Sequence, residues 1–134
     1  MNGYAIDANI ISFLLRGNRQ IQKRLYDEAN KGVSVVIPPI AYYEVKRGLI
    51  DAQATTKLTA FERLCAMLGV DVMDIKTFDV GANIYAKLKK DGRLIDDSDI
   101  LIGASCIAHG YTLVTDNTRH FNRIDNLQIE NWTV

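Results

Sequence analysis

Short apolar segments alternate along the chain with longer segments that have the 3.6-residue period of an amphipathic helix. The short segments are rich in β-forming residues and lie at 3–6, 33–37, 70–73 and 112–115, with a weaker fifth at 127–129. Strands that alternate with helices are typical of βα units around a parallel sheet. The pattern therefore predicts an α/β fold, namely a three-layer α/β/α sandwich with a parallel five-stranded sheet.

The helical segments show apolar residues at three- and four-residue spacings. They cover 19–31, 39–49, 55–68, a segment around 78–88 that ends by Gly92, and 97–109. Pro39 suits the first turn of the second of these helices. We expect Phe78 and Tyr85 to lie in the core, and only one of the adjacent Tyr42 and Tyr43 to face it.

Length and composition agree with one globular domain over residues 1–134. The chain has 134 residues, 48% of them hydrophobic, and no linker or repeat. Sixteen basic residues balance sixteen acidic ones, so a polyanionic partner must be met by a local surface. Cys65 and Cys106 lie among apolar residues and are expected to be free thiols. No signal peptide or membrane-spanning run is visible, so we expect a cytoplasmic protein without membrane contact.

Four acidic residues come where parallel strands end or where the following helices begin. Asp7 and Asp116 directly follow strands. Glu44 lies in the second turn of the helix after the second strand, and Asp99 lies in the first turn of the last long helix. Carboxyl ends of parallel strands form the ligand-binding edge of such sheets. Converging carboxylates repel one another unless a cation compensates, and an all-oxygen set favours Mg²⁺ or Mn²⁺ over Zn²⁺.

Each acid also has a structural explanation. Asp7 is suited to cap a helix beginning near Ile10. Asp97 and Asp99 are suited to the first turn of a helix, where they complement its dipole. Glu44 is also suited to the solvated edge of its helix. Accidental convergence of all four acids is much less expected than any one of these alternatives.

Four blocks of the sequence, in order and over nearly the full chain, resemble the PIN-domain endoribonucleases, most closely the VapC-type toxins of bacterial toxin–antitoxin pairs. The blocks are Tyr4-Ala5-Ile6-Asp7-Ala8-Asn9, the segment 38–48 around Glu44, the segment 92–104 around Asp99, and Leu113-Val114-Thr115-Asp116-Asn117-Thr118-Arg119-His120-Phe121. Ala8 stands where the family has threonine. The fourth block leaves open whether Asp116 or Asn117 completes the metal site.

The resemblance implies a PIN-like fold and a Mg²⁺- or Mn²⁺-dependent enzyme that cuts single-stranded or loop RNA, such as a tRNA or rRNA loop. It implies that Asp7, Asp99 and Asp116 hold the metal, while Glu44 binds a second ion or orients the attacking water. It also implies a small antitoxin protein as partner and a homodimer of the nuclease. No side-chain nucleophile is needed, because a bound ion activates water.

Further residues near the acids complete the expected site. Asn9, Thr115, Asn117 and Asp97 are candidates to orient a ligand carboxylate, although turn and cap roles explain them equally well. The candidates for RNA phosphate contacts are Lys46, Arg47, Arg93 and Arg119, of which Lys46 is the strongest.

Two other functions remain open at this stage. Asp7 followed two residues later by Asn9 resembles the start of haloacid-dehalogenase phosphohydrolases, but Asn9 cannot act as their acid, and no phosphate-binding lysine is evident. A PIN fold that only binds RNA or a protein partner is the third possibility. Uptake of Mn²⁺ at the acidic edge discriminates it from a nuclease.

Overall fold

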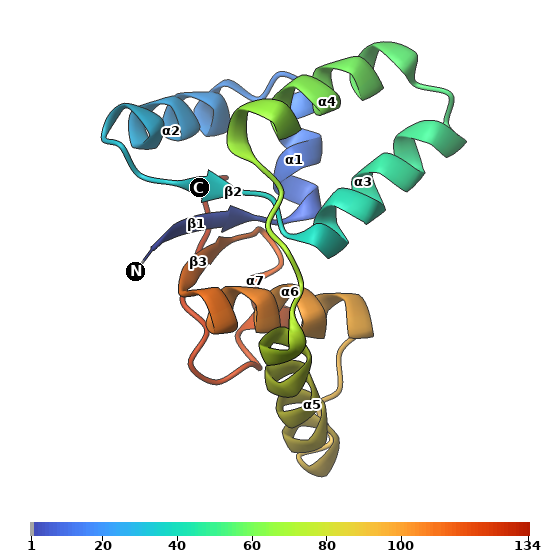
Figure 1. The fold of residues 1–134 in the computed structure, drawn as a ribbon, viewed down its shortest axis with the longest axis vertical. Helices are drawn as coiled ribbons and strands as arrows, with labels where there is room; N and C mark the ends of the chain where they lie inside the picture. Colours follow the sequence, from blue (N-terminus) through green and yellow to red (C-terminus); the bar gives the residue numbers. More distant parts are fainter. Residues whose placement is uncertain (1) are drawn as a thin grey trace.

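The computed structural model describes residues 2–134 and is a three-layer α/β/α arrangement around a parallel sheet (Figure 1). The sheet contains β1 (Gly3–Ile6), β2 (Val35–Val36), β3 (Tyr111–Val114) and β4 (Ile129–Glu130) in the order β2-β1-β3-β4. Every pairing in it is parallel. The predicted fold class is therefore confirmed, with β1 and β3 as the central strands.

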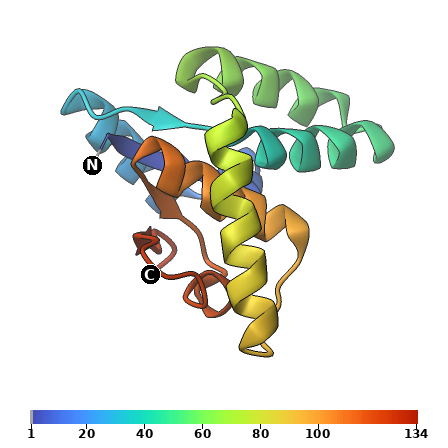
Figure 2. The same ribbon diagram turned by 60° about the horizontal axis from the view of Figure 1, so that its bottom comes forward.

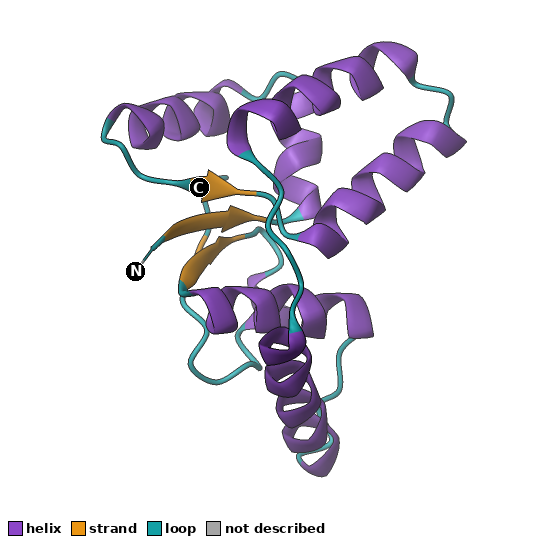
Figure 3. Ribbon diagram, viewed as in Figure 1, coloured by secondary structure: helices purple, strands orange, loops and turns teal. Residues whose placement is uncertain are grey.

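The helices lie on both faces of the sheet (Figure 3). One group consists of α1 (Ala8–Leu15), α2 (Arg19–Asn30), α3 (Pro39–Asp51) and α4 (Thr55–Leu68). The other consists of α5 (Ile75–Lys90), α6 (Asp97–His109) and the short α7 (Thr118–Phe121). Figure 2 shows α5 lying across α6. Gly81 makes this approach possible, because a Cβ there would lie only 3.3 Å from the Leu101 side chain.

The core is formed by the central strands and the inner faces of the long helices. Ile6, Leu113 and Val114 are fully buried on the strands, and Phe61 and Ile102 are fully buried on α4 and α6. Continuous burial of the strand residues is what helices on both faces of a parallel sheet produce. No helix of residues 2–134 is long and apolar enough to cross a membrane.

Two predictions from the apolar pattern are wrong. The segment 70–73 is not a strand, because it makes only a single parallel bridge, between Val70 and Ile37, so the sheet has four strands rather than five. Phe78 and Tyr85 are not core residues but are 48% and 41% exposed on α5. Their spacing is helical, but α5 buries another face, which includes Thr77, Gly81 and Leu88.

Other expectations hold. Helices α4 and α6 have the predicted bounds, 55–68 and 97–109. Tyr42 packs against the core and against the ring of Phe61, whereas Tyr43 is 57% exposed. Both cysteines are free thiols, Cys106 buried and Cys65 half-buried.

Candidate metal and nucleic-acid site

Asp7 lies at the carboxyl end of β1 and is also the N-cap of α1, so the capping explanation is correct and does not exclude a chemical role. Its Oδ1 accepts a hydrogen bond from the Ala8 backbone nitrogen at 2.7 Å. Its Oδ2 accepts one from the Thr115 hydroxyl at 2.8 Å. The carboxylate is only 6% exposed, and this burial raises its pKa, with Asp99 and Asp116 raising the pKa further by repulsion.

Asp116 follows β3, the neighbour of β1 in the sheet, and therefore emerges at the same edge. The side-chain amide of Asn9 donates a hydrogen bond to Asp116 Oδ1 at 3.1 Å. The amide of Asn117 instead lies 3.2 Å from Nδ1 of His120. This geometry favours Asp116 over Asn117 as the residue that completes the predicted metal site beside Asp7.

Glu44 and Asp99 approach the same edge from α3 and α6. The pKa of Glu44 is raised by partial burial and then by the charges of Asp7 and Asp99, with Arg47 partly offsetting the effect. The pKa of Asp99 is raised by burial, and the neighbouring His120 acts against this. The fold therefore brings all four predicted acids into one electrostatic field, although they are separated by up to 109 positions in the chain.

The donor set suits a hard divalent cation. The four side chains offer only carboxylate oxygens, and the pKa values of Asp7, Glu44 and Asp99 are raised, so a bound cation would compensate their negative charges. Within residues 2–134, no three His, Cys, Asp or Glu side chains are gathered closely enough to form a ready coordination shell. The chemistry of the donors nevertheless fits Mg²⁺ or Mn²⁺.

The candidate supporting residues have different placements. Thr115 is fully buried and holds Asp7 as described, and Asn9 holds Asp116. Asp97 is exposed in the first turn of α6, where Asp96, not Asp97, is the N-cap. The sequence predicts that Asp97 orients a ligand carboxylate. Within residues 2–134, however, Asp97 makes no contact with the other acids.

The candidate RNA-binding cations lie on the helices and turns around the acids. Lys46 is one turn beyond Tyr42 on α3, and its ammonium donates a hydrogen bond to the Tyr42 hydroxyl at 2.9 Å. The Arg47 guanidinium lies 5.0 Å from the centre of the Tyr43 ring. Arg93 and Arg119 are exposed.

Sequence reasoning missed His120 as a site residue. In the structure its Nδ1 lies 3.5 Å from Asp99 Oδ2. Its place in the fourth block, one helical turn after Asn117, was the available signal.

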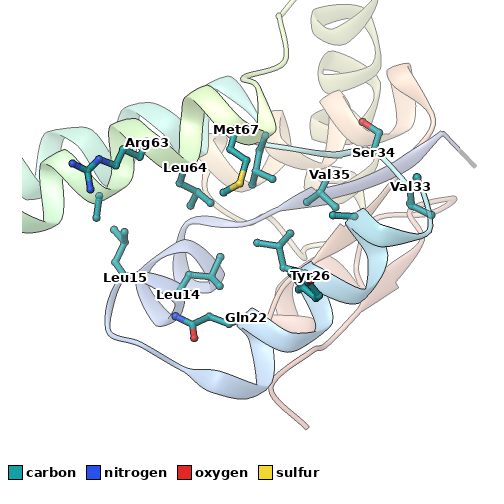
Figure 4. Close-up of a pocket in the computed structure, with 15 residues that line it drawn as sticks. Leu14, Leu15, Gln22, Tyr26, Val33, Ser34, Val35, Arg63, Leu64 and Met67 are labelled. Carbon is teal, nitrogen blue, oxygen red and sulfur yellow. The ribbon is translucent and has the colours of Figure 1, made fainter.

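A separate apolar cavity of about 770 Å³ lies between α1, α2, β2 and α4, and none of the four acids lines it. Figure 4 shows Leu14 and Tyr26 on one side of it and Leu64 and Met67 on the other. Arg63 brings a positive charge to its lining. Glu44 instead lines a smaller hollow of about 240 Å³ with Arg16 and Lys57. This apolar cavity and the acidic edge are thus two different surfaces.

Comparisons with known proteins agree on one family. A family model described as PIN domain matches residues 4–127. Ribonuclease VapC2 of Haemophilus influenzae is 30% identical over 131 residues, covering 96% of this chain and 97% of the relative. The tRNA(fMet)-specific endonuclease VapC of Shigella flexneri is 26% identical over 131 residues, covering 97% and 98%. The crystal structure of DNA-bound VapBC from Salmonella typhimurium is similar with a TM-score of 0.90 and 25% identity, covering 98% of this chain and 99% of that one.

Proposed function

The chain belongs to the PIN domain family, and from this premise we propose that it is an endoribonuclease that uses Mg²⁺ or Mn²⁺ to hydrolyse RNA phosphodiester bonds, as the toxin of a toxin–antitoxin pair. The family assignment made from the four sequence blocks is confirmed, and the haloacid-dehalogenase alternative is thereby set aside. The observation that supports the proposal is that Asp7 and Asp116 follow the neighbouring strands β1 and β3. Asp99 also acts by repulsion on both Asp7 and Glu44.

The proposed roles follow from how each side chain is held. A bound divalent ion would acidify a water molecule and neutralise charge on the phosphate. Asp7, Asp99 and Asp116 would hold it. Asp7 is already fixed by two hydrogen bonds and Asp116 by one, so two of the three ligands are pre-oriented. Glu44, whose pKa is raised, would accept a hydrogen bond from the attacking water or bind a second ion.

The substrate proposal rests on the local surface rather than on net charge, which is zero. Arg47, Arg93 and Arg119 are exposed, and Arg47 acts electrostatically on Glu44. These three residues would contact phosphates of the RNA. Lys46 would join them once its ammonium leaves the Tyr42 hydroxyl. A tRNA or rRNA loop is the proposed target class, supported by the relative named a tRNA-specific endonuclease.

We also propose a small antitoxin as partner, supported by the likeness to VapBC. Two surfaces suit it. The four acids attract an arginine or lysine of the partner, since a guanidinium pairs with carboxylates in two-point contacts. The apolar cavity between α2 and α4 offers a place for apolar side chains of the same partner. Self-association of the nuclease stays a prediction, to which the exposed Tyr43 lends support.

The direct test combines calorimetric titration with Mn²⁺ and cleavage of a stem–loop RNA in the presence of Mg²⁺. We expect uptake of Mn²⁺, products with 5′-phosphates, and loss of cleavage when EDTA is added. The Asp99→Asn variant should lose both binding and cleavage. Asp51→Asn, an exposed acid at the end of α3, serves as the matched control. A folded native protein that binds RNA without taking up Mn²⁺ would instead be a non-catalytic PIN module.

A further inference from the structure

A continuous chain of polar contacts connects two of the four acids. The Thr115 hydroxyl donates to Asp7 Oδ2 at 2.8 Å, and the Asn117 backbone nitrogen donates to the Thr115 hydroxyl at 3.0 Å. The Asn117 side-chain amide lies 3.2 Å from His120 Nδ1, which in turn lies 3.5 Å from Asp99 Oδ2. Residues 115–120 therefore link an acid on the β1 side of the site to an acid on α6.

His120 is the end of this chain that packing does not explain. Its side chain is 41% exposed, whereas the next residue, Phe121, is fully buried and anchors α7. The helix has only four residues, and its apolar contact with the core is made by Phe121. A histidine at an exposed position of so short a helix contributes little to stability, so its contact with Asp99 needs another explanation.

Both contacts of the ring are made by the same nitrogen. Nδ1 faces Asp99 and Asn117, so it either donates a hydrogen bond to the carboxylate or accepts one from the amide. Only the first alternative orients the carboxylate, because one ring nitrogen carries either a proton or a lone pair and cannot make both hydrogen bonds at once. The carboxylate of Asp99 is thus approached by the His120 ring, which lies beside the Asn117 side chain.

We propose that His120 is a positioning residue of the nuclease, which through Nδ1 and with Asn117 orients the Asp99 carboxylate for the metal. This inference rests on the proposed function, since it assigns Asp99 as a metal ligand. Asn117 lies between the two acids, because its backbone nitrogen donates to the Thr115 hydroxyl while its side chain lies beside His120. A hydrogen-bond partner behind a ligand governs metal affinity and turnover by about 10- to 100-fold.

The test uses three substitutions that separate the two ring nitrogens. Asparagine places polar atoms where Nδ1 stands, whereas glutamine places them nearer Nε2. We expect His120→Ala to raise the Mn²⁺ dissociation constant about tenfold and to lower kcat by a similar factor, with the KM for RNA changed less than about twofold. His120→Asn should recover most of both losses, and His120→Gln should behave like His120→Ala. Asn122→Ala, an exposed neighbour, is the control.

Metal-free NMR keeps this inference distinguishable from the proposed function. The carboxyl ¹³C shift of Asp99 should move in His120→Ala and return in His120→Asn, whether or not the protein is a nuclease. Unchanged Mn²⁺ affinity and kcat in His120→Ala, or equal recovery by glutamine and asparagine, would overturn the positioning role. A native protein that neither binds Mn²⁺ nor cuts RNA would overturn the proposed function, and with it the role of His120 toward a metal, while the ¹³C shift still reports the contact.

Discussion

Replacing Asp7 by asparagine should abolish RNA cleavage while leaving the metal-free protein at least as stable as the native one. Asp7 is 6% exposed, and its pKa is raised by burial and then by the repulsion of Asp99 and Asp116. Its negative charge therefore destabilises the metal-free folded protein. Each pKa unit of elevation corresponds to about 1.4 kcal/mol of lost stability at neutral pH. Neutralising the side chain removes that loss.

The opposing cost is modest. Asparagine caps helices about as well as aspartate, so the bond from the Ala8 nitrogen is kept. The new amide would donate to the Thr115 hydroxyl instead of accepting from it, at a cost of about 1 kcal/mol. The net change in unfolding free energy should therefore be near zero or stabilising. For a chain of 134 residues each kcal/mol shifts Tm by about 4 °C.

Thermal melts of the native protein and Asp7→Asn, with EDTA and with Mn²⁺, give the measurement. Because the folded pKa lies above the unfolded value of 3.8, native stability should fall as pH rises from about 4 through the folded pKa, and the variant should lack this contribution. Mn²⁺ should raise the Tm of the native protein only. Cleavage should fall by at least about 100-fold, or about 2.7 kcal/mol of barrier. A variant that melts several degrees lower at pH 7 in EDTA would refute the charge argument, and one that still cuts RNA would refute the ligand assignment.

Three further outcomes are expected. Asp116→Ala should raise the Mn²⁺ dissociation constant about tenfold or more, whereas Asn117→Ala should act mainly on stability and on the placement of His120. The reverse pattern in paired titrations and melts would make Asn117, not Asp116, the fourth residue of the metal site. The His109 ring lies 2.6 Å from Asp71 and 3.2 Å from Asp74, and the hydrogen bond to Asp71 is the main cause of its raised pKa. The stabilisation from this pair should be complete below about pH 6.5 and decline as pH rises through the folded pKa; equal pH dependence in native and His109→Asn melts would contradict it. Light scattering should show a dimer. Co-expression with the protein of the adjacent reading frame should yield a complex of the two proteins and relieve growth inhibition. A monomer that binds no partner and does not inhibit growth would contradict the toxin function.

The residues that could be predicted from sequence are those whose signals are local. Alternating short apolar runs and helical periods indicated the parallel α/β fold, and the bounds of α4 and α6 followed from periodicity and terminal glycines. The four acids were predicted as one site because strand ends in parallel sheets share one edge. Their order and spacing also identified the family.

Tertiary structure decided what local pattern does not contain. The segment at 70–73 has strand composition but makes only one bridge, beside the edge strand β2, because strand formation depends on the packing around a segment more than on its composition. Phe78 and Tyr85 have helical spacing, yet the face of α5 that meets α6 is chosen by the close approach at Gly81. The turn after β3 directs Asp116 to Asn9 but Asn117 to His120, and it brings His120 to Asp99. Sequence could not predict this, because the direction of a side chain in a turn is set by the backbone and not by residue type.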